Sequence, residues 1–145
     1  MLTVVAAIIE SQGKLLVCQR RRGDAFELMW EFPGGKVKPG ENLEKALERE
    51  LMEELGAAAR IGPEVYRTLH KYDQMGEPIE LIFFAASLEP GRPKNLAFEQ
   101  SLWLEPKALR ELRFLPADRE FVEKLATNAF RLPQVSRDIG NREQH

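Results

Sequence analysis

The sequence is poor in the residues that most often carry nucleophilic catalysis and zinc binding. Among 145 residues there are two histidines, His70 and His145, and one cysteine, Cys18. Two histidines exclude a His-rich zinc site, and a Ser-His-Asp triad would depend on His70 alone. One cysteine can form no disulfide within the chain, which is typical of a reducing compartment. Catalysis would therefore fall to carboxylates, arginines, lysines and a metal ion.

Long apolar runs and an excess of one charge are also missing. No run approaches the ~20 apolar residues that cross a bilayer. Residues 2–9 are apolar, but they lack a basic lead-in and are followed by Glu10 and a turn, which favours a strand over a signal peptide. With 21 basic and 23 acidic residues, the net charge is −2. We therefore predict a cytoplasmic protein that binds neither a membrane nor a nucleic acid polymer.

The composition that remains is that of one folded domain. Apolar residues make up 43% of the chain and charged residues 30%, and a chain of this length buries a sufficient core without disulfides. From residue 133 onward the sequence is polar and has no apolar period. We predict one domain over residues 1–132 and a flexible C-terminal tail over residues 133–145. The sequence leaves open whether the protein is a monomer or a homodimer.

Strands and helices are predicted in mixed order. Residues 2–9 and 15–19 are rich in apolar and β-branched side chains and flank a Ser-Gln-Gly-Lys turn, which predicts a hairpin. Further strands are predicted over residues 58–61, 65–72, 80–87 and 102–104, and helices over residues 106–112 and 117–126. Strands with interspersed helices predict an α+β fold or α/β/α layering.

The strongest helical pattern covers residues 43–55. Leucines recur there every four residues, Asn42 stands at the N-cap position, and Gly56 stands where a helix-ending glycine belongs. This segment also carries a cluster of acidic residues.

Three glutamates share one face of this helix. Glu50, Glu53 and Glu54 lie at positions i, i+3 and i+4, where like charges destabilise a helix by about 0.2–0.5 kcal/mol per pair. The helix dipole also disfavours anions near the C-terminus. A bound divalent cation would offset both costs, and carboxylates without His or Cys indicate a hard ion, Mg²⁺ or Mn²⁺. The alternative is a solvated acidic face.

The residues around the glutamates favour the metal interpretation. Gly34 and Gly35 follow a proline, which argues against a helix or a central strand and lets the backbone approach a ligand closely. Arg20 and Lys36 offer positive charge to phosphate oxygens, and Arg49 directly precedes the first glutamate. Carboxylates for a metal and cations for phosphate together indicate metal-assisted phosphoanhydride chemistry.

Residues 35–57 resemble the Nudix box. The seven fixed positions of that motif all match, at Gly35, Glu41, Arg49, Glu50, Glu53, Glu54 and Gly56. Ala57 departs from it, since a larger aliphatic residue is usual there. Residues 30–36 and 114–118 are similar to segments of the MutT branch, the small nucleoside-triphosphate pyrophosphohydrolases. The resemblance covers roughly residues 2–127.

This resemblance implies a Nudix α/β/α sandwich in which the box forms a loop–helix–loop against a mixed sheet. It implies metal ligands at Glu50, Glu53 and Glu54, completed by the Gly35 carbonyl. It further implies that Arg49 orients the glutamates, that Glu41 fixes the loop or supports the metal shell, and that Arg20 and Lys36 hold phosphates. Glu99 is the candidate for an additional base or metal ligand on a late loop.

The implied reaction converts a nucleoside triphosphate, a small-molecule substrate, into the monophosphate and pyrophosphate, with Glu53 or Glu99 taking a proton from the attacking water. Phe32 is a candidate for stacking on the base, and Asp118 for reading it. An ionised aspartate only accepts hydrogen bonds and suits the cytosine amine, although Asp118 could equally cap a helix. We predict cleansing of oxidised nucleotides such as 8-oxo-dGTP. The alternatives are (d)CTP or 5-methyl-dCTP hydrolysis and a non-catalytic regulatory module.

Overall fold

The computed structural model describes residues 1–71, 76–90, 92–127 and 131–135. In chain order its elements are β1 (Leu2–Ser11), β2 (Lys14–Gln19), β3 (Trp30–Glu31), β4 (Gly34–Lys36), α1 (Leu43–Leu55), β5 (Ala59–Lys71), β6 (Pro78–Leu88), β7 (Gln100–Leu104), the 3₁₀ helices η1 (Pro106–Glu111) and η2 (Pro116–Asp118), and α2 (Arg119–Ala126).

The described strands form a mixed sheet. Its central order is β3-β2-β1-β6-β5, with β4 also paired to β1 and β7 to β2. Strands β1 and β6 run parallel and the other pairs are antiparallel. The predicted hairpin is confirmed, since β1 and β2 are joined by Gln12 and Gly13, both with positive φ, as a tight two-residue hairpin turn requires.

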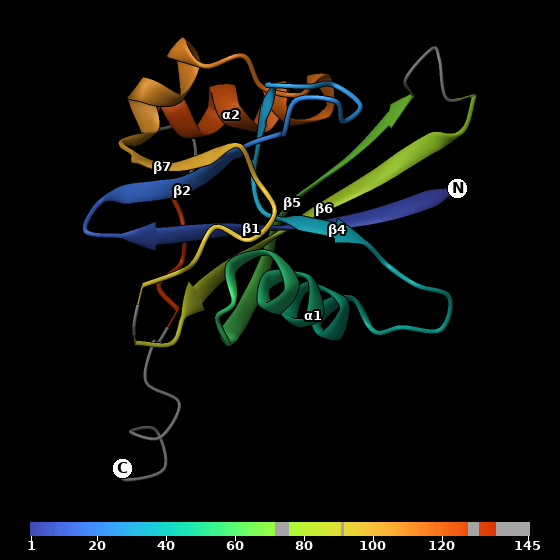
Figure 1. Ribbon diagram of the computed structural model, residues 1–145, viewed down its shortest axis with the longest axis horizontal. Coiled ribbons are helices and arrows are strands. Elements are labelled where there is room, and N and C mark those ends of the chain that lie inside the picture. The colour runs from blue at the N-terminus through green and yellow to red at the C-terminus, as the bar shows by residue number, and fades with distance from the viewer. Residues whose placement is uncertain (72–75, 91, 128–130, 136–145) are drawn as a thin grey trace, which may run out of the picture.

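Side chains of β1 alternate between two cores because successive residues of a strand face opposite sides of the sheet. Val5 and Ala7 belong to the core beneath α1. Ala6 and Ile8 belong to the core beneath α2 and the 3₁₀ helices. Figure 1 shows α1 on one side of the sheet and α2 on the other. The predicted α+β sandwich with a mixed sheet is therefore confirmed.

Helix α1 begins and ends as the sequence predicts. The Asn42 side chain accepts a hydrogen bond from the Lys45 N–H, and Gly56 adopts the left-handed conformation with φ 62°. Leu47 and Leu51 are fully buried against the sheet. Glu50 and Glu54 border this buried face and point toward β4, where the Gly34 N–H donates to Glu54.

Strand β5 differs from the prediction of two strands at residues 58–61 and 65–72. It is one strand whose pairing with β6 shifts register between Ile61 and Tyr66. The Gly-Pro sequence at residues 62–63 therefore forms an irregularity instead of a break, because an edge strand tolerates proline. Tyr72, at the end of the predicted strand, lies outside the described residues.

The helices predicted over residues 106–112 and 117–126 are shorter than expected. The first is the 3₁₀ helix η1, and α2 begins at Arg119, directly after η2. Each 3₁₀ helix carries a proline at its start, which fits the first turn of a helix because no N–H is needed there. None of the described helices is long and apolar enough to span a membrane.

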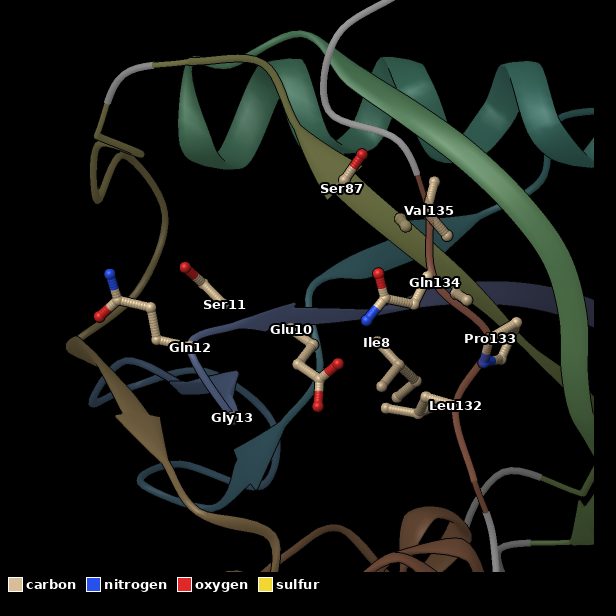
Figure 2. A pocket seen from close by; sticks show the side chains of 12 residues that line it. Ile8, Glu10, Ser11, Gln12, Gly13, Ser87, Leu132, Pro133, Gln134 and Val135 are labelled. Atoms are coloured by element: carbon tan, nitrogen blue, oxygen red, sulfur yellow. The ribbon is translucent and has the colours of Figure 1, made fainter.

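The first residues of the predicted tail lie against the sheet. Residues 132–135 border a cavity of about 700 Å³ beside the ends of β1 and β6, and Figure 2 shows Leu132 next to Ile8. A Cβ atom on Gly62 would lie 2.6 Å from Val135 Cγ2, so this segment passes close to β5. The prediction of flexibility for residues 136–145 falls outside the described residues.

Candidate active site

A second cavity, of about 480 Å³, brings together most of the predicted site residues, and we call it the carboxylate cavity. It lies where β1, β4 and α1 meet the segment that precedes α2. Its polar lining residues are Arg20, Glu31, Lys36, Glu50, Glu54 and Asp118, and its apolar wall includes Val4, Phe26, Phe32, Ile79, Leu81 and Leu115. Glu53, Arg49 and Glu99 do not line it.

The two adjacent glycines let α1 and β4 approach each other and β1. A Cβ on Gly34 would lie 2.0 Å from the Val5 carbonyl oxygen, and a Cβ on Gly35 would lie 2.4 Å from Glu50 Cδ. The Gly34 N–H donates to Glu54 Oε1 at 3.0 Å. The glycines thus allow two of the three glutamates to pack directly against the strand, a role that the sequence did not reveal.

Arg49 holds the surrounding carboxylates together. Its guanidinium donates to both oxygens of Glu41, at 2.8 and 3.0 Å, and to Glu50 Oε1 at 3.0 Å. It also donates to the Lys36 carbonyl at 3.1 Å and to Glu53 Oε1 at 3.4 Å. The hydrogen bonds from Arg49 lower the pKa of Glu41 to about 2. These contacts support the orienting role implied for Arg49 and the loop-fixing role implied for Glu41.

Carboxyl groups are crowded in the cavity beyond the number that Arg49 can pair. The pKa of Glu54 is raised to about 9, mainly by burial and also by the charges of Glu50 and Glu31, although the hydrogen bond from the Gly34 N–H lowers it. Burial also raises the pKa of Glu50, although Arg49 lowers it. Anionic oxygens gathered without imidazole or thiolate fit a hard divalent cation. The donor set at this place is therefore suited to Mg²⁺ or Mn²⁺.

The three predicted metal ligands are not equally placed. Glu50 and Glu54 line the cavity with Gly35, whereas the Glu53 side chain is 57% exposed and pairs with Arg49. Within the described ranges, no three His, Cys, Asp or Glu side chains are grouped closely enough to hold a metal ion. Glu53 would have to turn toward the cavity to join the other two.

Two of the predicted residues make contacts that the sequence did not indicate. Arg20 forms an ion pair with Glu31 at 3.2 Å and donates to the Ala25 carbonyl at 2.6 Å. Glu99 lies just before β7, where its Oε1 accepts from the Arg22 N–H at 3.4 Å. Lys36, by contrast, is exposed at the cavity rim, with its charge available to an anion.

The lining of the carboxylate cavity includes a buried carboxyl group, that of Asp118. Asp118 is 3% exposed, and although it occupies the N-cap position of α2 it makes no cap hydrogen bond. Burial, and then the charge of Glu31, raise its pKa well above the usual range, while a hydrogen bond from the Phe32 N–H lowers it. A neutral Asp118 offers both a donor and an acceptor. The premise that it only accepts is therefore not supported.

Glu31 is a cavity residue that sequence reasoning missed. It lies between Trp30 and Phe32, in a strand of two residues whose neighbours are buried. Burial raises the pKa of Glu31, and the paired Arg20 lowers it. A charged residue between two buried aromatic residues was the available signal. The sequence does not reveal this position as part of the cavity, because Trp30 pairs with the distant segment 113–115. That pairing is not evident from the sequence.

Replacing Asp118 by asparagine tests its protonation state. Because the folded protein holds this proton more tightly than the unfolded chain, wild-type stability should fall as pH rises from about 4 toward the raised pKa. D118N lacks that titration, so urea unfolding should show it to be more stable than wild type by about 1–3 kcal/mol at pH 8. The difference should vanish near pH 4. The exposed-site variant D24N serves as control, and an unchanged pH slope in D118N would mean that Asp118 is ionised when folded.

A sheet between two helical layers, with a glutamate-bearing helix packed on a Gly-Gly strand, defines a class of hydrolases. Residues 1–125 match the NUDIX domain, and the chain belongs to this family. It is a Nudix hydrolase, acting on phosphoanhydride bonds. Nudix hydrolases generally use a divalent metal, in agreement with the donor set of the carboxylate cavity.

Several characterised and solved relatives are similar over most of the chain. The CTP pyrophosphohydrolase of Escherichia coli K12 is 37% identical over 85% of this chain and 90% of its own. The 8-oxo-dGTP diphosphatase of Haemophilus influenzae is 34% identical over 84% of this chain and 89% of its own. The solution structure of the E. coli ORF135 protein superimposes with a TM-score of 0.75 at 36% identity, covering 89% of each chain.

Proposed function

We propose that the protein hydrolyses nucleoside triphosphates to the monophosphate and pyrophosphate, and that oxidised purine nucleotides such as 8-oxo-dGTP are its preferred substrates. One observation carries this proposal. The carboxylate cavity is lined by Glu50 and Glu54 beside the Gly-Gly strand, by the buried Asp118 and by an apolar wall. This arrangement suits a ligand with a charged phosphate chain and a flat base.

The residues around the glutamates would have separate roles in metal binding, phosphate binding and proton transfer. Glu50, Glu53, Glu54 and the Gly35 carbonyl would hold Mg²⁺ or Mn²⁺, which supplies neutralisation of the phosphate charge and activation of water. Lys36 at the rim contacts phosphate oxygens. Glu53 accepts the proton of the water that attacks the β-phosphorus, with Glu99 as the alternative base. The bond between the β-phosphorus and the oxygen that bridges it to the α-phosphorus breaks. The nucleoside monophosphate leaves with that oxygen, and the β- and γ-phosphates leave as pyrophosphate.

The base preference rests on Asp118. In the neutral form, it presents a donor and an acceptor together, as an asparagine does, and this supports an oxidised guanine as ligand. Discrimination by such a buried pair of hydrogen bonds is worth about 1–3 kcal/mol. Cytosine nucleotides, (d)CTP and 5-methyl-dCTP, form the second candidate class, favoured by the similarity to a CTP pyrophosphohydrolase. A non-catalytic regulatory role has less support, since all three glutamates are present.

Pyrophosphate release from a panel of nucleotides tests this proposal. The panel contains 8-oxo-dGTP, dGTP, dCTP, 5-methyl-dCTP and CTP, each assayed with and without Mg²⁺. We expect kcat/KM for 8-oxo-dGTP to exceed that for dGTP and the cytosine nucleotides at least about 10-fold. Preference for cytosine nucleotides would contradict the base assignment. Absence of turnover across the panel would contradict the reaction itself.

The same proposal places the protein in the cytoplasm, as a monomer or homodimer that acts on free nucleotides. Cys18 supports a reducing compartment because the chain has no second cysteine with which it could pair. Burial raises the pKa of its thiol far above the physiological range. Gel filtration and fractionation of cells that express the protein would test both parts.

A further inference from the structure

The loop between β2 and β3 carries an aromatic residue into the carboxylate cavity. Two aromatic side chains line the described part of this cavity, Phe26 and Phe32. Phe32 is 3% exposed and packs against Phe83 and Phe114, with ring centroids 6.0 and 5.4 Å away. Phe26 is partly exposed. Of the two rings, Phe26 therefore offers a planar ligand the larger accessible surface.

The backbone of this loop is held in an unfavourable conformation. Phe26 and Leu28 have φ values of 56° and 62°, in the left-handed region that residues with a side chain rarely occupy. Backbone hydrogen bonds from Leu28 to the Arg20 carbonyl, and from Met29 to the Phe26 carbonyl, hold the loop in this shape. Strain of this kind persists where the surrounding structure enforces it, and it is concentrated at functional sites.

Two side chains hold the loop in this shape: the Gln19 amide donates to the Leu28 carbonyl at 3.0 Å, and Arg20 contacts the residue before Phe26. The Arg20 guanidinium spans from the Glu31 carboxylate, at 3.2 and 3.4 Å, to the Ala25 carbonyl, at 2.6 Å. Ala25 is the residue directly before Phe26, so this bridge ties the loop tip to β3. A guanidinium that contacts Glu31 on one side and Ala25 on the other has less freedom to bind phosphate, whereas the exposed Lys36 at the rim is the better placed cation.

We propose that Phe26 stacks on the base of the substrate, and that Arg20 is a positioning residue that holds Phe26 in place and does not bind phosphate. This inference rests on the proposed nucleotide hydrolysis and names a residue that determines its substrate class. The ligand it requires is a planar heterocycle, since a flat ring gives the largest contact with Phe26.

Replacing Phe26 tests the first part. In F26A and F26L, we expect KM for the preferred nucleotide to rise roughly 5- to 100-fold, the range for loss of one base–aromatic stack. The value of kcat should change little, because stacking is present in both the ground state and the transition state. L28A is the matched control, since Leu28 lies in the same loop with the same backbone conformation but does not line the cavity.

Combining variants tests the second part. If Arg20 acts through Phe26, R20Q should raise KM in the wild-type background and have less than about a twofold effect in F26A. R20K should behave as R20Q, because lysine cannot bridge two acceptors as the guanidinium fork does. Inhibition by inorganic pyrophosphate should be unchanged in R20Q and R20K and weakened in K36Q.

A phosphate-binding Arg20 would give the opposite pattern. The losses of R20Q and F26A would multiply, R20K would restore affinity, and pyrophosphate would inhibit R20Q more weakly. Any of these results overturns the positioning role. Unchanged KM in both F26A and F26L overturns the stacking role, with thermal unfolding used to verify that the variants are folded.

Binding measurements separate this inference from the proposed reaction. Calorimetric titration with 8-oxo-dGMP and with CMP needs no turnover, and F26A should weaken binding of the tighter ligand by the same 5- to 100-fold. Binding that depends on Phe26, without any hydrolysis of triphosphates, would sink the proposed reaction and leave the stacking role standing. Hydrolysis of triphosphates together with binding that is independent of Phe26 would overturn the stacking role and leave the proposed reaction standing. If triphosphates are not hydrolysed and nucleotide binding does not depend on Phe26, both the proposed reaction and the stacking role are overturned.

Discussion

Glu53→Gln is expected to lower kcat at least about 100-fold while leaving the fold intact, since a general base contributes typically 10²- to 10⁴-fold. The Glu53 side chain is 57% exposed and its contact with Arg49 is long, at 3.4 Å, so removing its charge should shift the unfolding free energy by no more than about 0.5 kcal/mol. The measurement is steady-state pyrophosphate release together with thermal unfolding.

Two further variants make the Glu53 result specific. Glu48→Gln changes a glutamate of the same helix that pairs with Lys45 away from the cavity, and it should retain wild-type turnover. Glu99→Gln tests the alternative base, and we expect a loss well below that of E53Q, because Glu99 contacts the Arg22 N–H whereas Glu53 shares helix α1 with Glu50 and Glu54. Activity of E53Q above a tenth of wild type would remove Glu53 from the role of base.

Gly34→Ala is expected to destabilise the protein by at least about 3 kcal/mol, near the upper range for overpacking. The new methyl group would lie 2.0 Å from the Val5 carbonyl oxygen and 2.7 Å from Ala6 Cα. Both are backbone atoms, so no side-chain rotation can relieve the contact. The pairing of β4 with β1 must open, and Glu54 would lose its hydrogen bond from the Gly34 N–H.

Gly40→Ala is the matched control for this effect. Gly40 has φ 76°, and nothing lies within 4 Å of a Cβ placed there, so the change should cost only the strain of the left-handed conformation, about 1–2 kcal/mol. Chemical unfolding of both variants and a kcat measurement below the melting temperature of G34A would check the prediction. Equal stability of G34A and G40A would mean that β4 and β1 are farther apart at Gly34 than the structure shows.

The sequence predicts helix α1 well because its signals are local. The leucine repeat, Asn42 and Gly56 determine where α1 lies, and the spacing of the glutamates determines which of them share a face. These features need no knowledge of the rest of the fold. The hairpin of β1 and β2 is predicted for the same reason.

Features that depend on distant segments were missed or assigned differently. The exposure of Glu53, the burial of Glu31 and the Arg20 bridge depend on how loops 20–29 and 113–118 pack on the sheet. The continuity of β5 depends on pairing with β6 across the Gly-Pro sequence. Local propensity contains no information on these contacts, because each is decided by tertiary packing.

The parallel pairing of β1 with β6 has a consequence for how the chain folds. Leu2 lies opposite Ile79, so the first strand must wait for a partner some 77 residues later in the sequence. Both cores draw residues from both strands, among them Val5 with Ile82 on one side and Ala6 with Phe83 on the other. A nascent chain can form the hairpin and α1 early, but neither core closes before β6 has left the ribosome. Such long-range closure slows folding, and until then the apolar surface of β1 is exposed to chaperones and to other chains.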